Sequence, residues 1–253
     1  MEVNAFFAAV LRGLGYHVVS VGAKVSLATG GGGEGFLGYN HQLSLVTIPN
    51  HPHPYAVDVG FGADTPTQPL PLIPSLITRG WHPTSTMKLT RSALPGGADP
   101  TPRFWVYEHS RNYGVDGEGQ EVEGTKWTPG YAFTEVEFTR EDYEVMNVGT
   151  MEGVRSLFTR TVVGARFAGW EELVEWGVVK READGEVVER YGGLVGQVTL
   201  MGGVVKVKVR GMVVREVKLG SEEERGEALG RYFGVWLTER GEGNIKGLVS
   251  HLK

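Results

Sequence analysis

The stretch that most constrains the fold runs from Gly35 to Gly62 and reads GFLGYNHQLSLVTIPNHPHPYAVDVGFG. Two strand-like runs, Gln42–Ile48 and Tyr55–Val59, flank a turn of Asn, His and Pro, which predicts an antiparallel hairpin. His41 opens the first run and Asp58 lies near the end of the second. Residues at the open ends of a hairpin come close together, so we expect the carboxylate to hold the imidazole in one tautomer and to stabilise its cation. A single turn carboxylate without a histidine partner remains the alternative for Asp58.

Composition narrows the class of protein. The chain has 253 residues, 41% of them hydrophobic, and a net charge of −5. It has no apolar run of the ~20 residues that span a bilayer and no signal-peptide pattern, and its acidic balance is unlike the basic footprint of a nucleic-acid binder. We therefore expect a cytoplasmic protein without a membrane or nucleic-acid partner. The sequence contains no cysteine, which excludes disulfides, thiolate metal sites and a cysteine nucleophile within these residues.

The first residues predict a helix over Met1–Leu14. No capping residue precedes it, so it begins as though it were part of a longer element; a frayed terminal helix is the alternative. A strand is expected over Tyr16–Ala28, and Gly30–Gly33 predicts a flexible loop without the Lys-Ser/Thr of a phosphate site. The apolar residues expected on the buried face of the helix are Val3, Phe6, Phe7, Val10, Leu11 and Leu14.

The middle of the chain alternates between loops and strands. Ala63–Arg103 is rich in proline and predicts a long segment that wraps over the surface. Strands are expected at Phe104–His109 and Trp127–Phe138, and Thr139 with Asp142 predicts the start of a short helix.

The last hundred residues predict mostly strands and one helix. Ser221 with Glu224 forms a capping box, and the helix that follows is expected to bury Leu229, Tyr232, Phe233 and Trp236. The expected strands are Thr159–Val163, Val178–Glu182, Glu186–Tyr191, Val198–Leu200, Val204–Arg210 and Met212–Leu219. The predicted fold class is α+β, with a helix remnant (1–15), a barrel-like antiparallel domain (16–138) and a C-terminal sheet domain with one helix (139–253).

Two polar clusters have an ordinary and a functional interpretation. Lys206, Lys208 and Arg210 alternate with valines, which is typical of a solvated strand face and less often of a contact for an anionic ligand. His51 and His53 could join His41 at a metal, but the prolines around them favour a rigid turn. We therefore predict no metal.

Several segments together resemble one enzyme family. NHQLSLV followed by YAVDVGFG resembles the arylamine N-acetyltransferases, in which a His opens one strand and an Asp lies in a D-x-G-F-G turn. The start, MEVNAFFAAVLRGLGY, resembles the family segment directly after the motif R-G-G-[YFW]-C. The segments YAFTEVEFTREDYEVMN, SLFTRTVV and RYFGVWL resemble later parts of fungal-type members, in the same order.

The resemblance implies roles for single residues. His41 and Asp58 would be the catalytic His and Asp, Phe61 would line the acceptor pocket, and Asn40 would lie beside the bound substrates. The donor would be acetyl-CoA, and the acceptor a small arylamine or hydrazine, as in xenobiotic metabolism. The residues implied to contact coenzyme A are Gly38, Gly149, Arg155 and Ser156.

The resemblance also implies a missing group. The family transfers an acetyl group through a cysteine, which would align directly before Met1, while Ser44 should face away from His41. We therefore expect a truncated acetyltransferase that is inactive as given. The alternatives are a non-catalytic protein that binds acyl-CoA or an aromatic amine, and a β-rich interaction module. An exposed apolar face on the first helix would favour self-association.

Overall fold

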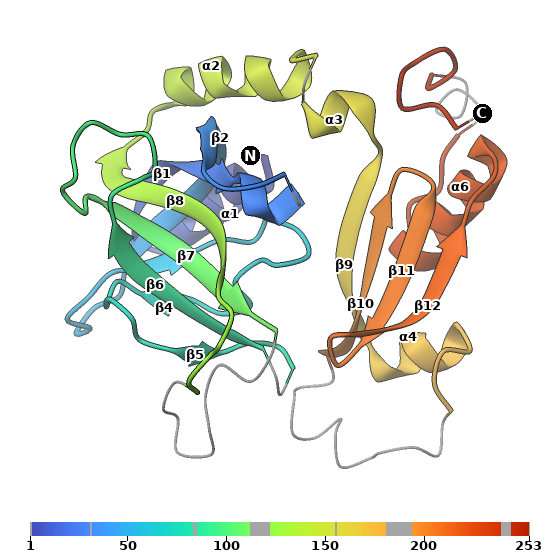
Figure 1. The fold of residues 1–253 in the computed structure, drawn as a ribbon, viewed down its shortest axis with the longest axis horizontal. Coiled ribbons are helices and arrows are strands. Elements are labelled where there is room, and N and C mark those ends of the chain that lie inside the picture. The colour runs from blue at the N-terminus through green and yellow to red at the C-terminus, as the bar shows by residue number, and fades with distance from the viewer. Residues whose placement is uncertain are drawn as a thin grey trace. The chain divides into compact units, whose positions relative to one another are not determined.

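The computed structural model describes residues 2–30, 32–82, 85–111, 122–154, 156–180, 194–238 and 244–252. The chain divides into two compact units, residues 1–149 and residues 150–253. The first contains a nearly closed, barrel-like antiparallel sheet, and the second contains a smaller antiparallel sheet with short helices (Figure 1). The class is α+β, as the sequence predicts.

The first unit begins with helix α1 (Glu2–Gly13) and ends within helix α2 (Arg140–Met151). Its sheet has the order β4-β3-β2-β1-β8-β7-β6-β5, with β1 and β2 as the longest pair. A short 3₁₀ turn at Leu27–Gly30 follows β1. The strands are β1 (His17–Ser26), β2 (Phe36–Thr47), β3 (Tyr55–Val57), β4 (Leu70–Pro71), β5 (Thr78–Arg79), β6 (Thr86–Ser92), β7 (Phe104–Ser110) and β8 (Thr128–Glu137).

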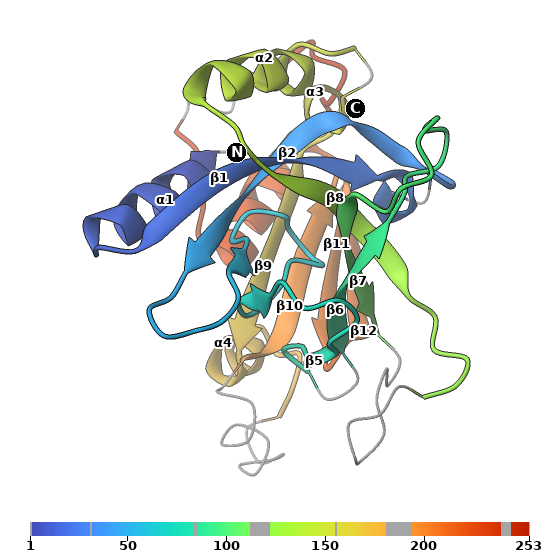
Figure 2. The same ribbon diagram turned by 90° about the vertical axis from the view of Figure 1, so that its left-hand side faces the viewer.

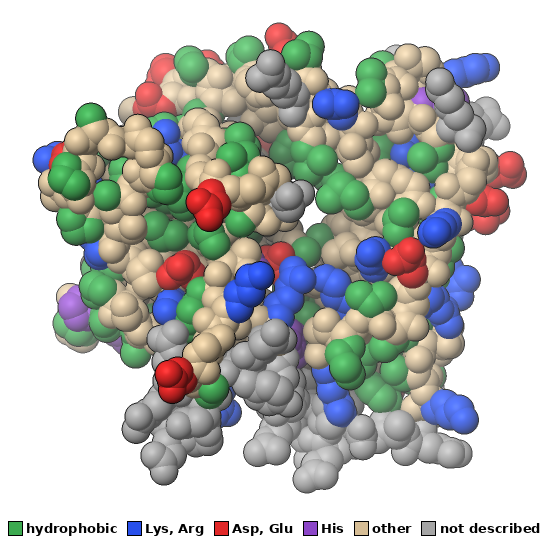
Figure 3. Space-filling view, viewed as in Figure 1, with side chains coloured by type: hydrophobic (Ala, Val, Ile, Leu, Met, Phe, Trp, Pro, Cys, Tyr) green, Lys and Arg blue, Asp and Glu red, His purple; other side chains and the backbone are tan. Residues whose placement is uncertain are grey.

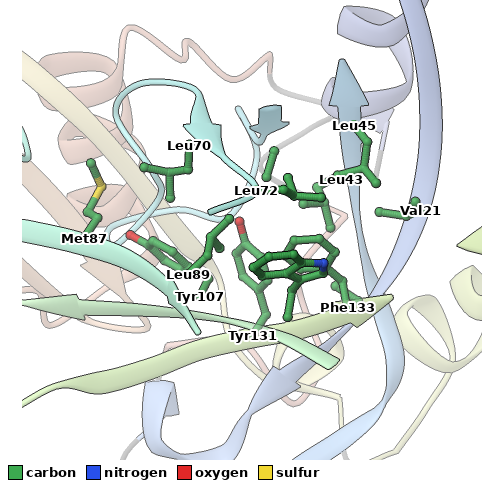
Figure 4. Packing of buried hydrophobic residues seen from close by; sticks show 13 residues of the cluster. Val21, Leu43, Leu45, Leu70, Leu72, Met87, Leu89, Tyr107, Tyr131 and Phe133 are labelled. Atoms are coloured by element: carbon green, nitrogen blue, oxygen red, sulfur yellow. The ribbon is translucent and has the colours of Figure 1, made fainter. Parts of the chain in front are cut away.

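The inner face of this sheet forms the main core of the first unit. Alternation along β2 turns Leu43 and Leu45 inward, and β1 contributes Val21 in the same way. Tyr107 and Tyr131 lie with their ring centroids 5.0 Å apart among these aliphatic side chains (Figure 4). The core therefore combines aliphatic packing with an aromatic layer.

Helix α1 packs on the outer face of β1 and β2 with a face that the sequence does not predict (Figure 2). Asn4 and Ala8 are buried, whereas Val3 is 58%, Phe6 72% and Val10 40% exposed. The expected burial of Val3, Phe6, Val10 and Leu14 is therefore wrong. Apolar residues occupy two sides of this helix, and the small Ala8 lets the helix backbone approach the sheet on the side that carries the polar Asn4.

The second unit is built on the sheet β12-β11-β10-β9. Valines and leucines on one face of β10 and β11 pack against Leu173, Ala228 and Tyr232 from the helical segments. Its elements are α3 (Leu157–Arg160), β9 (Val163–Gly169), α4 (Trp170–Glu175), β10 (Leu194–Met201), β11 (Val204–Val209), β12 (Met212–Lys218), α6 (Glu222–Ala228) and a π-helical turn, η2 (Leu229–Phe233). The Ser221 hydroxyl caps α6 by accepting from the Glu224 N–H, as predicted.

Several expected elements differ from those observed. The predicted strand Thr159–Val163 begins instead as helix α3, because Ser156 caps that helix by accepting from the Phe158 N–H. Residues 178–179 form a bend after α4 and residue 180 is irregular, so no strand begins there. Residues 181–182 and the predicted strand Glu186–Tyr191 lie outside the described residues. The helical turn η2 ends at Phe233, because Gly234 adopts a left-handed conformation. Trp236 therefore lies outside the helix and is 78% exposed, although the sequence predicts its burial.

The proline-rich segment Ala63–Arg103 also contains more structure than its composition predicts. It contributes the seven-residue strand β6, whose first four residues are buried. Its prolines lie outside β6, and the one within a strand, Pro71, belongs to the edge strand β4. A local proline count therefore overestimates loop content here.

The basic strand face of the second unit is used for pairing within the sheet. Lys206 forms an ion pair with Glu216 at 3.2 Å, and the Lys208 ammonium donates to the side-chain oxygen of Gln197. Lys and Arg side chains gather over these strands, interspersed with acidic ones (Figure 3). The arrangement is that of a half-exposed sheet face, which is the interpretation that the alternating pattern favours.

Replacement of Leu43 tests the assignment of the barrel core. Leu43 is fully buried, so Leu43→Ala should lower the free energy of unfolding of the first unit by about 2–5 kcal/mol. Leu37→Ala, on the half-exposed end of the same strand, should cost less than about 1 kcal/mol. Urea denaturation measures both, and equal losses in the two variants would contradict this core.

Candidate active site

His41 lies at the point where the regular pairing of β1 with β2 ends. Ala23 pairs with His41, but the next residue of β1, Lys24, pairs with Tyr39, so Asn40 is the extra residue of a β-bulge. The Asn40 side-chain oxygen accepts from the Val25 N–H at 3.1 Å, which holds the bulge in place. Bulges redirect neighbouring side chains, and His41 follows this one as a buried residue.

Asp58 follows β3 and is held by groups from three segments. Its Oδ2 lies 2.7 Å from Nε2 of His41 on β2. Its Oδ1 accepts from the Gly60 N–H at 2.9 Å and from the side-chain amide of Asn4 on α1 at 2.8 Å. The backbone oxygen accepts from the Thr65 hydroxyl at 3.2 Å. The predicted proximity of His41 and Asp58 is therefore present in the structure.

The surroundings of Asp58 favour its ionised form. Burial raises the pKa of this carboxyl group, but the charge of His41, together with the hydrogen bonds from His41, Asn4 and Gly60, outweighs that effect and lowers the pKa below its usual value. Burial also raises the pKa of the Tyr131 hydroxyl, and the negative charge of Asp58 raises it further. The site thus combines an ionised carboxylate with a neutral phenol.

Aromatic rings enclose the imidazole. The ring centroid of Phe61 lies 5.2 Å from that of His41 in an edge-on arrangement, and the centroid of Tyr131 lies 5.3 Å away. The ring centroids of Phe61 and Tyr131 lie 4.9 Å apart. Because Nε2 is occupied by Asp58, Nδ1 is the nitrogen left for proton exchange, and it has no hydrogen-bond partner among the residues that the structure describes. This geometry suits a general base against an apolar wall.

The remaining predicted site residues lie in different elements, and not all of them belong to the first unit. Gly38 lies on the exposed part of β2, three residues before His41, and a Cβ there would meet nothing within 4 Å. Gly149 belongs to α2 in the first unit. Ser156 belongs to the second unit, and its hydroxyl donates to the Thr150 carbonyl besides capping α3. Arg155 lies outside the described residues.

Sequence reasoning missed two contributors to this site. Asn4 is 2% exposed and touches Asp58, although it lies in a helix whose apolar residues attract more attention. Its signal is a polar residue four positions before Ala8, on the side of the helix that packs against the sheet. Tyr131 could be placed only with the register of β8, because alternation alone does not tell which face of a strand lines a site.

No metal cluster is found in the described ranges, where no group of three or more His, Asp or Glu side chains could hold an ion. His51 lies in the turn between β2 and β3, where its Nδ1 is 2.9 Å from the Tyr55 hydroxyl. The His-Pro turn is therefore held by a local hydrogen bond. In the same described ranges, no helix has both the length and the apolar character needed to cross a membrane.

The chain is similar to known proteins over most of its length. The sequence profile of the family described as N-acetyltransferase matches residues 1–193. An N-malonyltransferase FDB2 of Fusarium pseudograminearum is 33% identical over 94% of this chain and 65% of its own length. A protein of the same name from Gibberella moniliformis is 30% identical over 97% of this chain and 66% of its own length. The chain thus spans about two-thirds of the length of these curated relatives.

Solved structures share the fold at lower sequence identity. The arylamine N-acetyltransferase from Salmonella typhimurium superposes with a TM-score of 0.68 at 20% identity, covering 96% of this chain and 73% of that one. The Mycobacterium marinum arylamine N-acetyltransferase in complex with CoA superposes with a TM-score of 0.65 at 22% identity, covering 92% of this chain and 67% of that one.

The lowered pKa of Asp58 predicts how stability depends on pH. A carboxyl group whose pKa is lower in the folded state stabilises the fold above its unfolded pKa of ~3.9, and this contribution is lost as the pH falls through the folded value. Asp58→Asn should therefore lower the free energy of unfolding by roughly 2–3 kcal/mol at pH 7, with a smaller loss at pH 3.

Urea titrations of the wild type and Asp58→Asn between pH 7 and pH 3 measure this difference. Glu34→Gln, which changes an exposed carboxylate, is the control and should follow the wild-type profile. A difference between wild type and Asp58→Asn that stays constant with pH would contradict the ionised state of Asp58.

Proposed function

Because the chain belongs to the arylamine N-acetyltransferase family, as a fungal-type member, we propose that it carries the His–Asp part of an acyl-CoA-dependent N-acyltransferase site. The observation that carries the proposal is the buried 2.7 Å contact between His41 Nε2 and Asp58 Oδ2, which leaves Nδ1 against an aromatic wall. A histidine held in this way is suited to take a proton from a nucleophile and return it later.

The proposed reaction has two steps. A thiolate attacks the carbonyl carbon of the acyl-CoA, the bond to the CoA sulfur breaks, and CoA leaves with a proton. The amine nitrogen then attacks the carbonyl carbon of the resulting thioester, loses its proton and takes the acyl group, while the thiolate is released. His41 moves the protons in both steps, and Asp58 orients it.

The chain contains no cysteine, so its own residues cannot form the acyl-thiol. The family resemblance places that cysteine directly before Met1, at the N-terminal end of α1. There a helix N-terminus and a nearby imidazolium would both lower a thiol pKa. We propose that the complete enzyme supplies the thiol from this position and that the 253-residue form is inactive. Reading the transcript upstream of Met1 for an in-frame R-G-G-aromatic-Cys segment tests this.

The donor is proposed to be an acyl-CoA and the acceptor a small arylamine or hydrazine. Two relatives described as N-malonyltransferases make malonyl-CoA a donor to test beside acetyl-CoA. Phe61 and Asn40 are proposed to contact the substrates beside His41. Gly38 is proposed to lie along the donor's pantetheine arm. The proposed roles of Gly149, Arg155 and Ser156 in coenzyme A binding rest on the resemblance alone. We also propose a cytoplasmic location and a role in xenobiotic metabolism.

A second candidate is a non-catalytic protein that binds acyl-CoA or an aromatic amine. The observation that favours it is an intact His–Asp pair and aromatic wall in a chain without a thiol. Calorimetric titration of the 253-residue chain with acetyl-CoA, malonyl-CoA and an arylamine tests binding apart from transfer. Measurable binding without transfer, in a protein whose translation begins at Met1, would support this candidate over the first.

The catalytic proposal predicts a gain of activity. The 253-residue chain should transfer no acyl group to an arylamine, whereas the chain extended by one cysteine before Met1 should do so. In the extended chain His41→Ala should lower kcat/KM by about 10²–10⁴-fold, because the thiol loses its base. His51→Ala, at the exposed turn histidine, is the matched control and should leave kcat/KM unchanged. Equal rates for His41→Ala and its parent would exclude the assigned role.

The exposed side of α1 predicts self-association. Val3, Phe6, Val10 and Leu14 form an apolar stripe on that side, which favours burial against another copy. Sedimentation velocity should show oligomers of the 253-residue chain, and Phe6→Glu should shift them toward monomer. Val136→Glu, on the exposed part of β8, is the control and should not. A monodisperse wild-type monomer would rule the proposal out.

A further inference from the structure

Both the amide nitrogen and the amide oxygen of Asn4 have hydrogen-bond partners beside the His–Asp pair. Its amide nitrogen donates to the backbone oxygen of Gln42 at 2.6 Å and to Oδ1 of Asp58 at 2.8 Å. Its oxygen accepts from the Val59 N–H at 2.9 Å. One residue of α1 therefore joins the strand that carries His41 to the turn that carries Asp58.

The network also determines which way the amide points. In the reversed orientation, the Asn4 oxygen would face two acceptors, the Gln42 carbonyl and the Asp58 carboxylate, and its nitrogen would face the Val59 N–H. Each of these contacts is repulsive, so the reversed amide is excluded. The Asp58 carboxylate thus receives a donor from Asn4 on Oδ1, which leaves Oδ2 for His41.

Gly60 provides the space for this amide. A Cβ built on Gly60 would lie 3.1 Å from the amide nitrogen of Asn4, which is closer than nine in ten Cβ contacts, and 3.6 Å from its Cγ, which is an ordinary distance. The backbone of Gly60 is not left-handed, so its φ does not require glycine. The glycine of the D-V-G-F-G turn is therefore explained by the close approach of Asn4.

We propose that Asn4 is a positioning residue, which holds the Asp58 carboxylate in the orientation that directs Oδ2 to His41. Asn4 does not touch His41; it acts through Asp58. Its location in the first turn of α1 also fixes the start of this helix relative to the imidazole, because the same amide is bonded to β2. The consequence for catalysis rests on the proposed acyl transfer, but the orientation of Asp58 does not.

The test observes the His41 ring proton directly. In the 253-residue chain, ¹H–¹⁵N spectra of the imidazole should show a downfield Nε2 proton that exchanges slowly with water; its loss in Asp58→Asn assigns it. Asn4→Asp keeps the shape of the side chain but replaces the donor with an acceptor that faces Asp58. At pH 7 this variant should lose the signal, or exchange that proton roughly tenfold faster or more.

Further variants separate orientation from general damage to the helix. Asn4→Ala should also speed the exchange, because it removes the donor to Oδ1 without adding a charge. Arg12→Gln is the control, because Arg12 also joins α1 to the sheet, through the Val18 oxygen and the Ser20 hydroxyl, without touching Asp58. It should leave the Nε2 signal unchanged, and far-UV circular dichroism verifies that each variant is folded.

A wild-type signal in Asn4→Asp and Asn4→Ala would overturn the proposal, as would an equal loss in Arg12→Gln. Should Asn4→Asp fail to fold, Asn4→Ala decides by the same readout. The measurement uses no substrate, so absent acyl transfer with an Asn4-dependent signal would contradict the proposed function alone. Activity in the cysteine-extended chain with an Asn4-independent signal would contradict only the role of Asn4.

Discussion

A buried carboxylate is stable only where positive charge and hydrogen-bond donors replace the water that it has lost. The first unit supplies both to Asp58. Its partners come from α1, from β2 and from the turn that contains Asp58 itself. The helix that starts the chain, the longest strand of the barrel and the turn after β3 therefore meet at a single side chain. Strand β2 is packed on both faces, by aliphatic and aromatic residues on its inner face and by α1 on its outer face. This packing holds His41 close to Asp58.

The same arrangement explains a β-bulge, a glycine and a small residue in α1. The bulge at Asn40 ends the regular pairing next to His41, and the Asn40 amide replaces the missing ladder bond. Gly60 leaves room for Asn4, and Ala8 lets α1 lie close enough for Asn4 to reach Asp58. The bulge interrupts a regular ladder and lies directly before His41, and Gly60 lies two residues after Asp58. This is the distribution expected where a fold is adapted to a site.

The sequence predicts the hairpin, the His41–Asp58 pair and the α+β class because each depends on short-range spacing. It does not predict which side of α1 is buried, since apolar residues occupy two sides and the polar Asn4 decides between them. It also does not predict β6, because the prolines on both sides of this strand favour a loop. It wrongly places Thr159 in a strand, because the cap from Ser156 outweighs the β propensity of the residues that follow. The contributions of Asn4 and Tyr131 depend on contacts between distant segments, which spacing along the chain does not reveal.

The most direct test of the proposed acyltransferase is intact-mass spectrometry of the complete protein, including any segment before Met1, after incubation with acyl-CoA and no acceptor. A single acyl group should appear on a cysteine that precedes Met1. Its formation should slow in His41→Ala, and an arylamine should remove it. No adduct, an adduct on another residue, or an adduct whose rate does not depend on His41 would contradict the assignment of His41 and Asp58 to acyl transfer.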